Sequence, residues 1–462
     1  MKVRNPSAIG AIPADLIRRE LQGQVLTPED RGYDQARTVF FGLFDRHPAL
    51  IAQVADADDV ARLVKLAREH GLELAVRSGG HSAAGHSMPD GAVVIDFQAM
   101  KAIEIDLESK TAWAESGVTA GEYTTAAGAQ GLVTGFGDTA SVGIGGITLG
   151  GGVGFLVRKH GLTIDDLLGA EVVTAEGEKL DVDAEKHPDL FWALRGGGGN
   201  FGVVSRFRYR LHELPEVVGG MLFLPATTDV ISGFLEAAEA ADEELSTILN
   251  VMTAPPMPFL PEEAVGKPIV MAFLTYAGEA EVGKTAIAPF RELADPIVDM
   301  VRPMTYPEMY MPEEGEFHPV AAGRTTFIDE ISNLTIERML AEIASSPAMM
   351  AACQLRVLGG AMAKVPDDAT AFGHRRRKLM ATAAAMFERP EEEEMYLPWV
   401  TNVMRLYDED YEVRAYTGFL ADEGPERVKA AYPGTTWERL TEIKRRYDPD
   451  NVFHHNQNIP PA

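Results

Sequence analysis

His81 has the sequence context that most clearly indicates chemistry. It directly follows Gly79 and Gly80, and glycines let the backbone turn tightly and approach a bound molecule closely. Two further glycine clusters occupy residues 143–154 and 196–202. One cluster alone would predict only a turn. Three clusters together predict a long anionic ligand that is cradled by backbone N–H groups.

Familiar nucleotide, metal and hydrolase motifs do not account for these clusters. Residues 197–202 satisfy the spacing G-x-G-x-x-G, but residues 189–195 predict a helix before it and residues 203–211 a strand after it. This order is the reverse of a dinucleotide-binding fingerprint. The sequence also has no Gly-Lys-Ser/Thr end to a glycine-rich run, no i, i+4 histidine pair with a carboxylate, and no Gly-x-Ser-x-Gly elbow. We therefore expect no P-loop, no metal site and no serine hydrolase.

Composition and charge narrow the possible partners. The chain has 42 Lys and Arg against 69 Asp and Glu, a net charge of −27, which repels nucleic acid and anionic membranes. Cys353 is the only cysteine, so redox chemistry cannot come from a disulfide pair and needs a cofactor. Residues 1–27 lack an apolar core of signal-peptide length, and no later stretch predicts a membrane span. We therefore expect a cytoplasmic location.

The elements that must position His81 alternate between strands and helices. Residues 51–54 predict a strand, apolar residues at helical spacing predict a helix over 60–67, and residues 74–77 predict a second strand that leads into the His81 loop. At 462 residues, two domains are expected. The glycine clusters thin out after Pro215, and we expect a second α+β domain from there.

Four segments together resemble the berberine bridge enzyme-like flavoproteins. They are residues 76–82, 137–154, 189–204 and 447–459, in order along the chain. The resemblance implies an α+β fold of the vanillyl-alcohol oxidase/p-cresol methylhydroxylase type. It has a two-part FAD-binding domain of residues 1–212 plus 421–462, with its core at about 45–212. An inserted substrate domain of residues 213–420 has an antiparallel sheet covered by helices.

The resemblance implies FAD held by a single covalent bond. In this family the histidine of Arg-x-Gly-Gly-His, here His81, bonds to the 8α-methyl group of the flavin, which raises its reduction potential. Relatives with a second, cysteinyl bond carry a cysteine where this chain has Thr139, and a hydroxyl is too poor a nucleophile to replace a thiolate. Val142 aligns with the residue that gates dioxygen, and valine there accompanies oxidases. The expected cofactor-binding residues are His81, Arg77, Ser78, Gly79, Gly80, Ser82, Thr139, Val142, Gly143, Gly145, Gly146, Gly152, Gly202, Val203, Val204, Asn456 and Asn458.

The resemblance does not assign the general base. Family members often use a tyrosine of a Tyr-x-Asn-Tyr strand near the carboxyl end, and here Phe419 stands at that position. Others place a glutamate before an apolar-His-Arg stretch, where this chain has alanine. Tyr416, Asp368 and Tyr407 are the remaining candidates.

The leading hypothesis is an oxidase of a small organic substrate. A C–H bond next to O or N of an alcohol, sugar or amine would deliver hydride to FAD, and dioxygen would be reduced to hydrogen peroxide. The same fold supports a flavin-dependent oxygenase or an oxidative cyclase of a natural product. The missing base residues also leave open a flavoprotein that only sequesters a small molecule. A monomer or a homodimer is expected.

Overall fold

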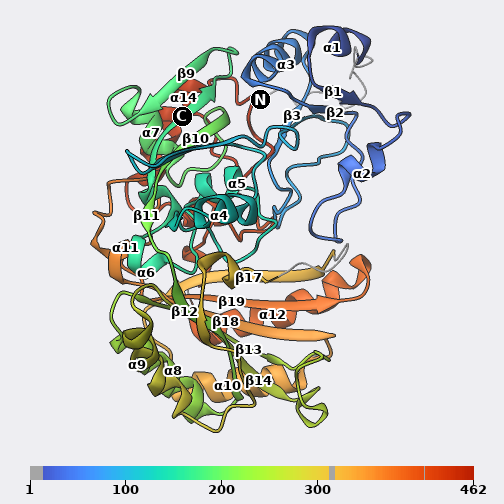
Figure 1. Ribbon diagram of the computed structural model, residues 1–462. Helices are drawn as coiled ribbons and strands as arrows, with labels where there is room; N and C mark the ends of the chain where they lie inside the picture. The colour runs from blue at the N-terminus through green and yellow to red at the C-terminus, as the bar shows by residue number, and fades with distance from the viewer. Residues whose placement is uncertain (1–13, 312–317, 410) are drawn as a thin grey trace.

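The computed structural model describes residues 14–311, 318–409 and 411–462. Figure 1 shows two lobes, and the C-terminal segment of the chain returns to the first of them. No helix in the described ranges is long and apolar enough to cross a bilayer. The first lobe holds the three glycine clusters.

A small sheet leads the chain into the His81 loop. Strands β2, β4 and β3 pair in parallel, and β1 adds antiparallel to β2. Helix α3 buries five apolar residues and ends at Gly71, whose φ is 65°, a conformation that favours glycine. The strand, helix and strand predicted over 51–54, 60–67 and 74–77 are confirmed. The bounds are β1 (Gln24–Leu26), β2 (Leu50–Gln53), α3 (Ala57–His70), β3 (Leu74–Arg77) and β4 (Val93–Asp96).

A five-stranded antiparallel sheet, in the order β5-β6-β10-β8-β9, forms the rest of the first lobe. Helix α7 precedes the third glycine cluster and β10 follows it, so the expected reversal of the dinucleotide-binding order is confirmed. The bounds are β5 (Ile103–Asp106), β6 (Thr111–Glu115), α4 (Ala120–Gly128), α5 (Ile144–Gly150), β8 (Leu167–Val173), β9 (Lys179–Asp183), α7 (Pro188–Leu194) and β10 (Val203–Arg210).

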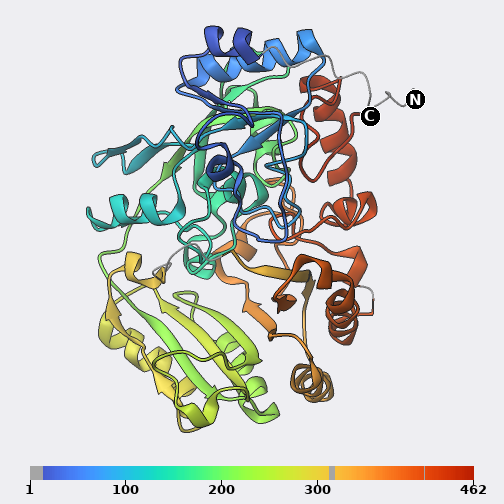
Figure 2. The ribbon, with the colours of Figure 1, turned by 90° about the vertical axis from the view of Figure 1, so that its right-hand side faces the viewer.

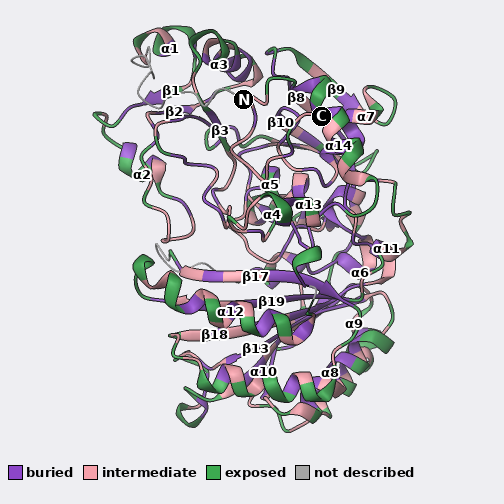
Figure 3. Ribbon diagram, turned by 180° about the vertical axis from the view of Figure 1, so that it is seen from behind, coloured by how far each residue is buried: buried purple, intermediate pink, exposed green. Residues whose placement is uncertain are grey.

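The second lobe is an antiparallel sheet with helices packed on one face (Figures 1 and 3). Its described strands run in the order β15-β12-β14-β13-β18-β19-β17, and β16 pairs with β12. We keep residues 213–420 as the proposed bounds of this domain. The strands are β12 (Val217–Pro225), β13 (Leu245–Thr253), β14 (Pro268–Tyr276), β15 (Val298–Asp299), β16 (Arg302–Met304), β17 (Val320–Ile328), β18 (Met350–Val357) and β19 (Leu379–Phe387). The helices are α8 (Thr228–Ala240), α9 (Ala280–Arg291), α10 (Asn333–Ser345) and α12 (Glu393–Tyr407).

The C-terminal segment returns to the first lobe, where α14 (Thr436–Tyr447) packs against α7 (Figure 2). The fully buried Lys444 donates hydrogen bonds to Asp448 Oδ2 at 2.6 Å and to Asn200 O at 2.7 Å. This buried ion pair fixes the segment beside the third glycine cluster. The remaining short elements are α1 (Ala14–Glu20), α2 (Tyr33–Arg37), β7 (Leu132–Val133), α6 (Val157–His160), β11 (His212–Glu213), α11 (Gly360–Lys364) and α13 (Pro425–Ala430), with 3₁₀ turns at 163–165, 262–264, 306–309, 390–392 and 411–413.

Candidate active site

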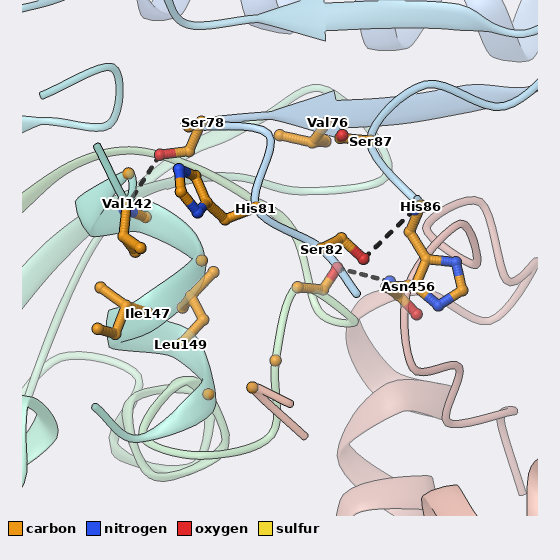
Figure 4. Close-up of a pocket in the computed structure, with 18 of the residues that line it drawn as sticks. Val76, Ser78, His81, Ser82, His86, Ser87, Val142, Ile147, Leu149 and Asn456 are labelled. Atoms are coloured by element: carbon orange, nitrogen blue, oxygen red, sulfur yellow. Dashed lines mark hydrogen bonds between the residues drawn. The ribbon is translucent and has the colours of Figure 1, made fainter. Parts of the chain in front are cut away.

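A cavity of about 390 Å³ lies in the first lobe at the meeting point of all three glycine clusters (Figure 4). This volume falls in the usual range for small-molecule sites. Of the residues expected to bind the cofactor, the cavity is lined by Ser78, Gly79, Gly80, His81, Ser82, Thr139, Val142, Gly143, Gly145, Gly146, Gly202, Val203, Val204 and Asn456.

Two of the glycine clusters touch one another where the cavity begins. A Cβ added to Gly79 would lie 2.2 Å from the backbone nitrogen of Gly143, and a Cβ added to Gly143 would lie 2.1 Å from Ser78 Oγ. The Ser78 hydroxyl donates to Ser116 O at 2.6 Å and accepts from Gly145 N–H at 3.2 Å. The His81 loop and the start of α5 can pack this closely only because these positions lack side chains.

The ring of His81 is held from two sides. It stacks on Phe40 with ring centroids 4.1 Å apart and an interplanar angle of 20°. Its Nε2 atom lies 2.8 Å from Ser141 Oγ, within hydrogen-bond distance. Figure 4 shows the ring beside Val142. Ser141 was missed in the sequence, although it lies within the 137–154 segment that carries the resemblance.

The cavity has free space and unpaired polar atoms, as a site for a large hydrogen-bonding ligand would have. A Cβ at Gly146 or Gly199 would meet no described atom within 4 Å. The buried atoms Ser87 Oγ and Asn456 Oδ1 have no hydrogen-bond partner in the described part of the chain, and both residues line the cavity. Buried polar atoms are rarely left unpaired in native proteins. The residues present therefore fit a bound dinucleotide such as FAD.

His86 also lines the cavity and was missed in the sequence. Burial lowers the pKa of His86 to about 4, so its imidazole is neutral at neutral pH. Its position five residues after His81, in the same loop, was the signal that could have identified it.

The C-terminal segment closes the cavity with His455, Asn456 and Gln457. Asn456 Nδ2 donates to Gly199 O at 3.1 Å. His454 Nε2 lies 2.8 Å from Glu73 Oε2, and this ion pair raises the pKa of His454. The segment is thus tied both to the third glycine cluster and to the residue just before β3.

Three of the expected cofactor-binding residues are not among the described residues that line the cavity. Arg77 donates from Nη2 to Thr38 O at 3.1 Å and supports the loop from outside. Gly152 has a φ of 82°, and a Cβ there would lie 2.0 Å from Thr163 Oγ1. Asn458 lies just beyond the C-terminal residues that line the cavity. Arg77 and Gly152 thus support the backbone around the cavity.

Of the three candidate bases, only Tyr416 reaches the cavity. Its side chain is 4% exposed, and its hydroxyl oxygen accepts a hydrogen bond from Gly152 N–H at 3.1 Å. Burial raises the pKa of Tyr416.

The placement of the other two candidate bases does not support them. The Asp368 side chain is exposed, and its backbone carbonyl accepts from Trp192 Nε1 at 2.8 Å. Tyr407 is buried in the second lobe, where its hydroxyl donates to Met339 Sδ at 3.1 Å. Neither residue lies among the described cavity-lining residues, so proton transfer to a ligand there is out of their reach.

Asp138 is the one carboxylate among the described residues that line the cavity. Its Oδ2 atom lies 2.5 Å from Arg356 Nη2, and its Oδ1 accepts from Thr139 Oγ1 at 3.2 Å. The sequence did not reveal this pair, because 218 positions separate its members.

Comparison with known proteins identifies the family. Residues 48–183 match the FAD binding domain family, and residues 415–460 match the berberine and berberine-like family. (R)-6-hydroxynicotine oxidase of Paenarthrobacter nicotinovorans is 30% identical over 468 residues, which cover 96% of this chain and 97% of that protein. The chain belongs to the berberine bridge enzyme-like FAD-linked oxidoreductases. Berberine bridge enzyme-like 9 of Arabidopsis thaliana is 28% identical over 91% of this chain and 86% of its own length.

Solved structures confirm the expected α+β fold. The crystal structure of 6-hydroxy-D-nicotine oxidase from Arthrobacter nicotinovorans superimposes with a TM-score of 0.85 at 27% identity and covers 100% of both chains. Xylooligosaccharide oxidase from Myceliophthora thermophila C1 gives a TM-score of 0.86 at 23% identity, over 98% of this chain and 100% of its own, which shows the fold alone. The protein is thus an FAD-linked oxidoreductase with the fold of these oxidases.

Proposed function

We propose that this enzyme is an oxidase whose FAD is held by one covalent bond, from the His81 imidazole to the flavin 8α-methyl carbon. Bound FAD would accept a hydride from a C–H bond next to O or N of a small organic substrate and pass both electrons to dioxygen. The observation that carries the proposal is the placement of His81 at the cavity where the three glycine clusters meet. A cytoplasmic location remains a prediction from the sequence.

Phe40 and Ser141 support attachment at His81. The stacked ring and the hydroxyl 2.8 Å from Nε2 hold the imidazole in one orientation, and an oriented nucleophile reacts faster than a mobile one. Formation of the bond removes one hydrogen from the imidazole and one from the methyl group, and dioxygen takes up both as hydrogen peroxide.

A single link is supported by the positions of Thr139 and Cys353. Thr139 lines the cavity, and the sequence resemblance matches it to the cysteine that forms the second bond in some relatives. Glucooligosaccharide oxidase from Acremonium strictum, whose structure is described with a 6-S-cysteinyl, 8α-N1-histidyl FAD, shares the fold with a TM-score of 0.85 at 22% identity. Cys353 is fully buried in β18 of the second lobe, and burial raises the pKa of its thiol to about 12.

Tyr416 is the residue that we propose as proton acceptor. The hydrogen bond from Gly152 N–H stabilises its phenolate form, while burial disfavours that form and raises its pKa. A substrate hydroxyl beside Tyr416 would transfer its proton to the phenolate as the neighbouring C–H bond breaks. Val142 lines the cavity, and its small side chain would leave dioxygen a path to the same region.

Anaerobic mixing with substrate, followed by admission of dioxygen, tests the proposal. An oxidase bleaches the flavin absorption band without dioxygen, recovers it with dioxygen, and forms one hydrogen peroxide for each product. Oxygen from labelled dioxygen in the product would instead indicate an oxygenase. A spectral shift without bleaching would indicate a protein that only sequesters its ligand.

A further inference from the structure

One face of the second-lobe sheet turns away from the helices, and we call it the inner face. The strand register identifies it, because side chains alternate across a strand. Leu249, Leu355 and Ala381 are buried in the core under the helices. Their neighbours Asn250, Gln354 and Thr382 therefore lie on the inner face, where they pair across strands β13, β18 and β19.

The inner face continues directly from the cavity in the first lobe. Arg356, the next inner-face residue along β18, donates from Nη1 to Val153 O at 3.3 Å and from Nη2 to Asp138 Oδ2 at 2.5 Å. On β17, the ring of Phe327 lies 6.4 Å from the ring of Tyr416. Val153, Asp138 and Tyr416 all line the cavity. The inner face thus begins directly beside residues that line the cavity.

Farther from the cavity, the side chains of the inner face are small and apolar. Ala352, Ala384 and Gly323 are neighbours across β18, β19 and β17, and all three are half-buried. Among the described residues, a Cβ at Gly323 would meet only Ala383 O at 3.6 Å and Ala384 Cβ at 3.9 Å. The next row contains Met350 and Met386, also half-buried and paired with each other. Gly323 thus lies beside methionines, whose side chains adapt to the shape of an apolar ligand.

The polar side chains of the inner face bind one another. Arg356 Nε donates to Gln354 Oε1 at 2.7 Å, and Gln354 Nε2 donates to Asn250 Oδ1 at 2.8 Å. The hydroxyls of Thr325 and Thr382 lie 3.0 Å apart. The guanidinium of Arg356 is neutralised by Asp138. This network leaves the wall without net charge, and its hydrogen-bonding groups already have partners.

We propose that the substrate is an uncharged, largely apolar alcohol whose hydroxyl lies at Tyr416 and whose apolar body rests on the inner face. The inference rests on the oxidase function proposed above. The several hydroxyls of a sugar would lose water against Ala352, Ala384 and Met386 without gaining partners. An ammonium group would need a carboxylate, and Asp138 is already paired with Arg356. The fold itself does not decide the substrate, because xylooligosaccharide oxidase has it too.

A substrate comparison combined with one filling substitution tests this inference in the holoenzyme. Benzyl alcohol and 1-octanol are compared with xylobiose for anaerobic bleaching of the flavin. Ala384→Trp places a large side chain on the inner face beside Gly323, and Leu334→Trp, at a position that is 55% exposed on α10, is the matched control. We expect bleaching by both alcohols and not by xylobiose. Ala384→Trp should raise KM for the alcohols about tenfold or more, with little change in kcat. The substitution removes surface that binds the substrate and leaves the residues that react with it unchanged. Leu334→Trp should behave as the wild type.

Two outcomes overturn the substrate class and leave the oxidase function standing. One is a higher kcat/KM for xylobiose than for the alcohols, and the other is an unchanged KM in Ala384→Trp. Toluene, which has no C–H bond next to O or N, separates binding from turnover. If no alcohol or sugar bleaches the flavin but toluene shifts its spectrum in the wild type and not in Ala384→Trp, the apolar binding surface is supported and the alcohol class is overturned. If toluene and the alcohols cause no shift and no bleaching, the inner face does not bind apolar compounds and the inference is wrong.

Discussion

Ser141→Ala probes how the protein prepares His81 for attachment. The substitution removes the hydroxyl that lies 2.8 Å from His81 Nε2, while the stacking on Phe40 remains. A hydrogen bond of this kind contributes about 0.5–1.5 kcal/mol, which corresponds to a factor of about 2 to 12 in the population of the oriented ring. We therefore expect covalent attachment of FAD to slow by about 2- to 12-fold and not to stop.

The assay is a time course of attachment. Protein produced under riboflavin limitation is mixed with FAD, samples are denatured in acid, and the flavin fluorescence that stays with the polypeptide is compared with the total FAD bound before denaturation. Ser141→Thr keeps the hydroxyl and is the matched control, which should attach FAD nearly as fast as the wild type. Attachment by Ser141→Ala at the wild-type rate would refute the orienting role. A loss of total FAD binding in the same proportion would show that Ser141 acts on binding instead.

Three further predictions concern the oxygen reaction, the base and the fold. Val142→Leu should slow reoxidation of the reduced flavin by dioxygen in stopped-flow measurements while reduction by substrate stays nearly unchanged, because one added methylene fills a small space in a close-packed wall. Tyr416→Phe should lower kcat by about 100-fold or more, the usual loss when a general base is removed. Because burial raises the pKa of Tyr416, its phenolate fraction grows only at alkaline pH, so wild-type kcat should rise with pH and the Phe variant should lose this rise. Lys444→Met leaves Asp448 buried without its partner, and the free energy of unfolding in urea should fall by about 3–5 kcal/mol; a fall below about 1 kcal/mol would contradict this reading of the ion pair.

Local patterns were enough to predict the elements that carry His81. The short apolar runs became β2 and β3, and the helical spacing between them became α3, because both signals depend only on neighbours in the sequence. The order of helix, glycine cluster and strand around residues 196–202 was also readable, which is why the dinucleotide-binding motif could be rejected. Here α7 and β10 stand where they were expected.

The site was only partly predictable, because several of its contacts join residues that are distant in the sequence. The glycines next to His81 predicted a binding site. The Asp138–Arg356 pair could not be predicted in this way, because it forms only when the second lobe meets the first. Asp368 was a reasonable candidate from its neighbours in the sequence. The hydrogen bond from Trp192 to its backbone carbonyl instead holds this segment with the Asp368 side chain in solvent. No local sequence pattern encodes whether the Asp368 side chain points into solvent or into the cavity.

Peptide mapping by mass spectrometry distinguishes a single covalent link between FAD and His81 from every other mode of attachment. After proteolysis of acid-denatured enzyme, we expect the mass of FAD on the peptide that contains His81 and on no other peptide, and its complete loss in His81→Ala. FAD found on a peptide with Thr139 or Cys353, or an unmodified His81 peptide from yellow wild-type enzyme, would contradict it.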